Sequence, residues 1–117
     1  MGVQVSEAAG HLRRRAEERA RAGELRAARL QALLPAAAAM LRERYGAQEI
    51  VLFGSLATGT ATAESDVDLA ARGVRSDDYF AAVADLMAVF GGPVDLVRLQ
   101  LAPPSLLDRI AAEGKPL

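Results

Sequence analysis

The stretch "LFGSLATGTATAESDVDLA", residues 52–70, decides both the fold and the chemistry expected of this chain. A Gly-Ser pair (54–55) ends a short apolar run, and ten residues later the sequence reads Asp-Val-Asp (66–68). The run "EIVLF" (49–53) is bounded by turn-forming residues, which predicts a buried strand. We therefore expect a strand, a glycine-containing turn and then a second strand that carries two carboxylates.

The two carboxylates of the second predicted strand (66–71) should point the same way. Side chains two residues apart lie on one face of a strand, so Asp66 and Asp68 project together while Val67 and Leu69 point to the core. Adjacent carboxylates repel each other, which raises the pKa of one of them unless a cation lies between them. Hard divalent cations, Mg²⁺ above all, prefer such oxygen ligands.

A third carboxylate lies in "PVDLVRL" (93–99), which predicts a third strand with Val94 and Leu96 inward and Asp95 on the opposite face. If this strand neighbours the second one, Asp95 can join the first two carboxylates. Three carboxylates can hold two metal ions in phosphoryl or nucleotidyl transfer. Taken singly, each feature has a simpler explanation: an ordinary turn, an exposed pair of acids, or a cap or edge charge. The combination favours a metal site.

The Gly-Ser pair could bind phosphate beside such a metal site. Glycine allows close backbone approach, and exposed N–H groups at the start of a helix bind phosphate. The hydroxyl of Ser55 can add one donor. Gly59 would let the loop turn back toward the second strand.

Helices account for most of the remaining chain. We expect one helix over 7–34, a break, a kink or a new helix at Pro35, and a stop at Gly46. Further helices are predicted over 76–90, with Ser76 as N-cap, and over 103–114. The expected inward faces of the first and third helices are Leu25, Ala28, Leu30, Leu33 and Leu34, and Phe80, Val83, Leu86, Met87 and Phe90. Helices on a small sheet indicate an α/β or α+β domain.

Composition limits the class of protein. The 117 residues predict one domain, and the absence of Cys excludes disulfides and thiolate metal sites. No secretion signal or membrane-spanning stretch is apparent, so we expect a cytoplasmic protein. Residues 1–45 carry nine Arg and five Glu (+4), whereas 46–117 carry five basic and ten acidic residues (−5). A nucleic-acid-binding active face would usually show the reverse, which makes nucleic acid an unlikely partner.

At these residues the chain resembles a known family. "GSLATGTATAESDVDL" is similar to the signature of the polymerase-beta-like nucleotidyltransferase superfamily, and most resembles its minimal nucleotidyltransferases, the MNT proteins of prokaryotes. The resemblance implies a small mixed sheet flanked by helices. It runs from about residue 35 to 117. This division predicts a minimal nucleotidyltransferase domain over 35–117 and an N-terminal helical extension over 1–34.

The resemblance also implies roles for individual residues. Asp66 and Asp68 would hold Mg²⁺. Asp95 would be the third carboxylate, which binds a second metal ion and helps to deprotonate the acceptor hydroxyl. The residues implied for the nucleoside triphosphate, typically ATP, are Gly54, Ser55 and Ser65. Family members often carry a basic residue where this chain has Thr58 and an acidic one where it has Thr60.

Many MNT proteins pair with a helical HEPT toxin and act as its antitoxin. The resemblance therefore implies AMP transfer from ATP, with pyrophosphate leaving, to a Tyr of such a partner. A small-molecule nucleotidyltransferase of the antibiotic-modifying type, and an antitoxin that acts by binding alone, remain as alternatives. The Arg-rich segment 12–29 is either a solvated, salt-bridged helix or a partner contact. Apolar surface on the long helix predicts an oligomer.

Overall fold

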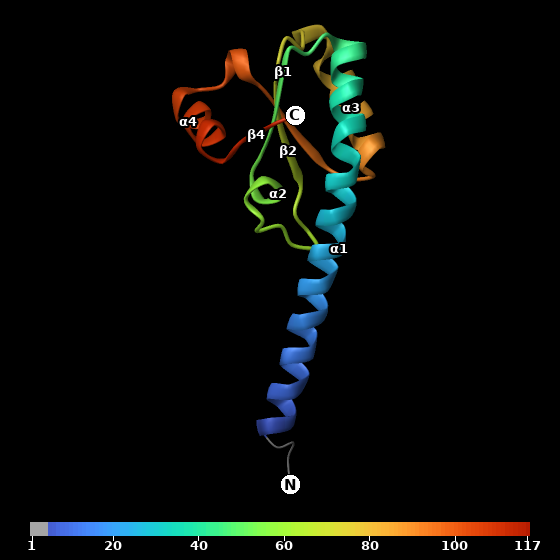
Figure 1. Cartoon of the computed structure of the whole chain (residues 1–117), viewed down its shortest axis with the longest axis vertical. Coiled ribbons are helices and arrows are strands. Elements are labelled where there is room, and N and C mark those ends of the chain that lie inside the picture. The colour runs from blue at the N-terminus through green and yellow to red at the C-terminus, as the bar shows by residue number, and fades with distance from the viewer. Residues whose placement is uncertain (1–4) are drawn as a thin grey trace.

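The computed structural model describes residues 5–117 (Figure 1). Its elements in chain order are α1 (Val5–Tyr45), β1 (Glu49–Phe53), α2 (Ser55–Thr58), β2 (Val67–Arg72), the 3-10 helix η1 (Ser76–Asp78), α3 (Tyr79–Phe90), β3 (Val94–Arg98), the 3-10 helix η2 (Leu99–Leu101), α4 (Pro104–Glu113) and β4 (Lys115–Pro116). The three predicted strands are confirmed, with shifts of one residue at some strand ends, and the short helix α2 begins at Ser55 of the predicted turn.

The four strands form one mixed sheet in the order β3-β2-β1-β4. β1 runs antiparallel to both β2 and β4, while β2 and β3 run parallel. The mixed α/β fold predicted from the sequence is confirmed. β4 was not predicted, because a strand of two residues is too short to carry an alternating pattern.

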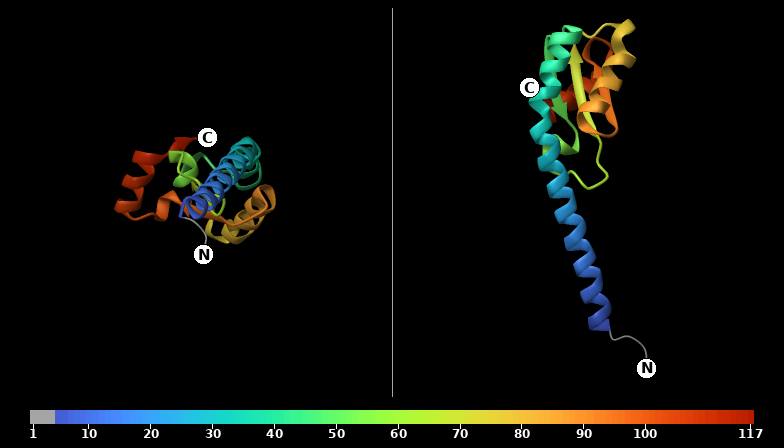
Figure 2. Two further views of the ribbon diagram at one scale, coloured as in Figure 1. Left: turned by 90° about the horizontal axis from the view of Figure 1, so that it is seen from below. Right: turned by 90° about the vertical axis from the view of Figure 1, so that its right-hand side faces the viewer.

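Helices cover both faces of this sheet (Figures 1 and 2). α1 and α3 pack on the face that carries Leu52, Leu69 and Leu96, which forms the larger core. α4 packs on the opposite face, where Ile110 meets Phe53 and the rest of a smaller cluster. Val67 and Leu69 are buried as predicted, so the side chains that alternate with them emerge on the α4 side.

Pro35 does not interrupt the first helix, and the predicted end or restart of a helix there is wrong. α1 is one helix of 41 residues with Pro35 inside it. Proline removes one helical N–H donor, but the side chain of Pro35 is exposed, so water can reach the carbonyl left free. Leu34 and Leu41, on either side of it, are buried in the core, so packing holds the helix together across the proline.

Only the second half of α1 packs on the domain, and the first half extends beyond it (Figures 1 and 2). Residues 11–22 are all exposed, and so are Leu25 and Ala28, which the sequence pattern wrongly placed inward. Over residues 8–29 of the described chain, no ion pair joins the interleaved Arg and Glu side chains. No helix within residues 5–117 is both long and apolar enough to cross a bilayer.

The start of α3 also differs from the prediction. Ser76 begins the 3-10 helix η1 rather than capping α3, and no side chain caps either element. Leu86 and Phe90 are buried as expected, but Phe80 and Met87 are exposed. α3 packs on the sheet through a narrower stripe than its apolar sequence suggests, which leaves Phe80 on the surface.

Candidate active site

Strand register brings the predicted carboxylates of β2 and β3 side by side. Asp68 and Asp95 are direct partners across the parallel β2–β3 pair. Phe53, the last residue of β1, is the partner of Asp68 on the other side. Cross-strand partners share one face of a sheet, so Phe53, Asp68 and Asp95 form a row, here called the central row, on the α4 side. Asp66 lies two residues before Asp68.

The surroundings of Asp68 disfavour its negative charge. Burial raises the pKa of the half-buried Asp68 carboxyl, and the neighbouring Asp95 raises it further. Arg109 lowers this pKa and Asp66 raises it again. The lowering effect of Arg109 is thus smaller than the combined effect of burial and the neighbouring carboxylates, and the pKa of Asp68 stays raised. A cation bound beside Asp68 would favour its ionised form.

The carboxylates do not converge into one ligand cluster. Among the described side chains, no three His, Asp or Glu residues lie close enough together to hold a metal ion. Asp66 and Asp95 are exposed, so their side chains can change rotamer without repacking the core. The register places them in one neighbourhood, and the three-carboxylate metal site stays a prediction.

Gly54 has a structural reason to be glycine. Its backbone adopts φ 74° and ψ −159°, a combination that is essentially confined to glycine. A Cβ atom at this position would also collide with Oδ2 of Asp68. The turn therefore lets the Asp68 carboxylate lie directly against the backbone of the Gly-Ser pair. Ser55 follows, half-buried, as the first residue of α2.

The loop that leads to Asp66 is held by side chains that the sequence analysis did not use for this purpose. The hydroxyl of Ser65 accepts a hydrogen bond from the N–H of Thr62 (2.8 Å). The guanidinium of Arg26 on α1 donates to the carbonyl of Ser65 (2.9 Å), and Gln31 donates to the carbonyl of Leu56 (3.2 Å). Here Ser65 stabilises the loop, and its role toward a nucleotide stays a prediction.

Thr58 and Thr60, where the family often carries opposite charges, bind each other instead. Their hydroxyl oxygens lie 2.9 Å apart, and the Thr58 hydroxyl also lies 3.2 Å from the carbonyl of Gly54. This neutral hydrogen bond joins the two ends of the turn and brings no positive charge to it.

Arg109 on α4 is the site residue that sequence reasoning missed. Its guanidinium carbon lies 5.7 Å from the centre of the Phe53 ring, which places a cation at the β1 end of the central row. Its Nε donates to Glu113 at 3.3 Å. The sequence predicted this helix but not which strand face it covers. Arg109 could have been identified from the sequence as a basic residue on the predicted helix 103–114, if that helix had been assigned to the carboxylate face of the sheet.

Comparison with known proteins identifies the family. The model of the family "Polymerase beta, Nucleotidyltransferase" matches residues 38–117. This region contains the Gly-Ser turn, Asp66, Asp68 and Asp95, and α4. No curated protein shows significant similarity to the chain.

Solved structures with similar folds include three informative relatives. A protein described as a minimal nucleotidyltransferase is 32% identical (TM-score 0.59), with 82% of this chain and 95% of that chain covered. A toxin–antitoxin structure with AMP-PNP is 30% identical (TM-score 0.61), with 66% of this chain and 65% of that chain covered. This chain thus spans slightly less than two thirds of that relative.

A more distant structure shares the fold alone. It holds a tri-AMPylated Shewanella oneidensis HEPN toxin in complex with MNT antitoxin, is 23% identical (TM-score 0.50), and has 80% of this chain and 70% of that chain covered. The family match over most of the chain, together with the central row beside the Gly-Ser turn, leads to one assignment. This chain belongs to the polymerase beta nucleotidyltransferase family, and its structural relatives include minimal nucleotidyltransferases and toxin–antitoxin proteins.

Proposed function

We propose that this nucleotidyltransferase transfers AMP from ATP to a hydroxyl group of a partner protein, a Tyr of a HEPT-type toxin, and so acts as an antitoxin in the cytoplasm. The observation that carries the proposal is the pairing of Asp68 with Asp95 beside Gly54, within a domain of the nucleotidyltransferase family. The relative with AMP-PNP supports ATP as the donor. The distant complex with a tri-AMPylated toxin suggests the class of acceptor.

The chain's own groups would divide the work as follows. Asp66, Asp68 and Asp95 would hold Mg²⁺, which fits them because all the donors are hard carboxylate oxygens and Asp68 lacks sufficient positive charge nearby. When bound, Mg²⁺ would neutralise charge on the phosphates. The Ser55 hydroxyl and the backbone at Gly54 would bind the triphosphate, and Asp95, the most exposed end of the row, would accept the proton of the acceptor hydroxyl.

The first test of this function is transfer of label. The purified chain is mixed with Mg²⁺, ATP labelled in its α-phosphate, and the proposed HEPT-type partner protein. We expect label on the partner, and none after EDTA removes the metal, because the carboxylates alone cannot hold a triphosphate. Label that persists in EDTA would contradict the metal-dependent proposal.

Arg109 would supply the positive charge that Thr58 does not. It stands at the β1 end of the central row, next to the Gly-Ser turn that would hold the phosphates. A hydrogen bond to a charged group is worth about 1.5–3 kcal/mol, so Arg109→Met should raise the KM for ATP about tenfold to a hundredfold.

Two matched variants sharpen this prediction. Arg109→Lys keeps the charge and should retain part of the affinity. Glu113→Gln removes the ion-pair partner of Arg109 without removing the cation, and should leave the KM for ATP no higher than in the native chain. An unchanged KM in Arg109→Met would show that α4 takes no part in nucleotide binding.

A second function, neutralisation of the partner by binding alone, is favoured by the uncharged Thr58–Thr60 contact. It predicts that the double variant Asp66→Asn/Asp68→Asn still neutralises the toxin. The catalytic proposal predicts that this variant does not neutralise it.

The projecting half of α1 points to an assembly. Isolated helices of its length are marginal in water, and residues 11–22 are all exposed. We expect this segment to pack against the toxin partner or a second copy of the chain.

A further inference from the structure

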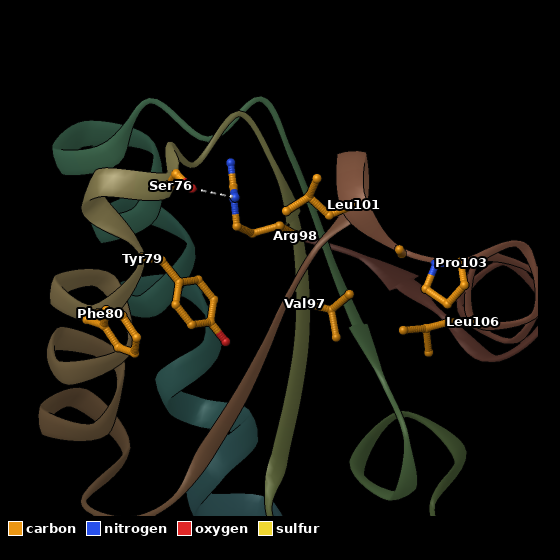
Figure 3. A pocket seen from close by; sticks show the side chains of 9 residues that line it. Ser76, Tyr79, Phe80, Val97, Arg98, Leu101, Pro103 and Leu106 are labelled. Atoms are coloured by element: carbon orange, nitrogen blue, oxygen red, sulfur yellow. Dashed lines mark hydrogen bonds between the residues drawn. The ribbon is translucent and has the colours of Figure 1, made fainter.

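An apolar pocket opens beside the outer edge of β3 (Figure 3). Its volume is about 410 Å³. Tyr79 and Phe80 from the start of α3 line one side, and Pro103 and Leu106 from the start of α4 line the other, with Val97 of β3 between them. The pocket thus lies where the two helices that cover opposite faces of the sheet approach its free edge.

The pocket begins next to the central row. Val97 follows Asp95 by two residues on β3, so both side chains lie on the α4 face. At about 3.3 Å per residue, their Cα atoms are separated by roughly 7 Å along the strand. A partner segment that fills the pocket and continues along β3 toward its first residues would therefore pass within reach of the Asp95 carboxylate.

Hydrogen bonds hold the side chains that form the walls of the pocket. The Tyr79 hydroxyl donates to the carbonyl of Leu96 (2.8 Å), which fixes the ring against the strand edge. The guanidinium of Arg98 donates to the carbonyl of Val74 (2.9 Å) and to the Ser76 hydroxyl (3.3 Å). These bonds hold the rim rigid, and rigid apolar pockets bind side chains at little ordering cost.

Two large apolar side chains at the pocket are largely exposed to solvent. Phe80 is 83% and Leu101 is 69% exposed. They come from separate elements, η2 and α3, yet both line this one pocket. Exposed apolar residues gathered at one pocket, beside a reaction site, are typical of a surface that a partner covers.

We propose that this pocket is the docking site of the acceptor protein: it receives an apolar or aromatic side chain that lies close, in the partner, to the hydroxyl that takes AMP. The inference rests on the proposed function for the identity of the occupant. The docked side chain anchors the partner along β3, and its hydroxyl then lies over the central row. The pocket supplies the acceptor-binding surface that a chain of this length does not build as a separate domain.

The test compares a pocket variant with a control variant of the full chain. Phe80→Ala/Leu101→Ala removes two exposed side chains that line the pocket. The control, Met87→Ala, removes an exposed apolar side chain of α3 that does not line it. The Kd for the HEPT-type partner is measured by calorimetry without nucleotide, and the KM values for partner and ATP are measured in the transfer assay.

We expect the pocket variant to weaken partner binding at least about tenfold, because truncation of a central apolar contact commonly costs more than a factor of ten. The control should bind as the native chain does, and the KM for ATP should stay unchanged in both. Equal Kd values for the pocket variant and the control would overturn the inference. So would a native chain that self-associates through the pocket, seen as a dimer in sedimentation that the pocket variant abolishes. Because the Kd is measured without nucleotide, this experiment tests the docking pocket independently of AMP transfer.

Discussion

The double variant Asp66→Asn/Asp68→Asn is expected to transfer AMP at least about a hundredfold more slowly than the native chain, since loss of one preorganised charged group at a reaction site alone costs this much. Asn keeps the size of Asp but removes the negative charge that would hold Mg²⁺. The rate is measured as label transfer to the partner at saturating ATP. The matched control, Asp77→Asn/Asp78→Asn, removes the same charge from η1, away from the central row, and should retain the native rate.

Stability separates this effect from misfolding. Burial and the neighbouring Asp95 raise the pKa of Asp68, so the folded chain disfavours the ionised form more than the unfolded chain does. This penalty is absent at low pH and grows as the pH rises through the raised pKa. In metal-free buffer at neutral pH, Asp68→Asn should therefore unfold at a higher temperature than the native chain. An inactive variant that also unfolds at a lower temperature would contradict the assigned role of the charge.

The variant Gly54→Ala is expected to be both less stable and nearly inactive. The positive φ costs an alanine about 1–2 kcal/mol. The added Cβ must in addition displace the Asp68 carboxylate or the turn itself, because Oδ2 of Asp68 occupies its place. We expect a loss of transfer comparable to that of the Asp variants, measured together with the free energy of unfolding in urea.

Gly91→Ala is the matched control for this substitution. Gly91 also has a positive φ, 72°, but its ψ of 21° places it in the left-handed helical region, whereas Gly54 has ψ −159°. No atom lies within 4 Å of the place its Cβ would take. Gly91→Ala should lose about 1–2 kcal/mol of stability and keep its transfer rate. If both variants lose activity in proportion to their stability, the contact between Gly54 and Asp68 has no special role.

Much of the fold could be predicted because the strand signals are local. Strand alternation placed Val67 and Leu69 in the core and the Asp side chains opposite, which the structure confirms for the buried positions. The pairing of Asp68 with Asp95 was expected only on condition that the two strands are neighbours. The register confirms that condition.

Other features could not be predicted, because they depend on packing between distant segments. The continuity of α1 through Pro35 follows from the core contacts of Leu34 and Leu41 on either side of it. The exposure of Phe80 depends on which side of α3 packs on the sheet, the side that carries Leu86 and Phe90. The place of Arg109 over Phe53 depends on the face that α4 covers. The helix pattern alone fixed none of these.

The identity of the site residues stays a prediction. Local spacing identified Asp66, Asp68 and Asp95, and the structure places them in one neighbourhood without convergence of their side chains. Side-chain rotamers of exposed carboxylates depend on the ligand they bind, which no sequence pattern specifies. The division of the chain at residue 34 stays a prediction, although Leu30 and Leu34 pack in the core.

The most direct test of the central claim is the intact mass of both chains after incubation of the purified protein with Mg²⁺, ATP and the HEPT-type partner. The account predicts that the partner gains one or more AMP units, on a Tyr located by peptide mapping, and that this gain disappears with Asp66→Asn/Asp68→Asn. A partner that binds the chain tightly but gains no mass, or gains it equally with the double variant, would contradict it.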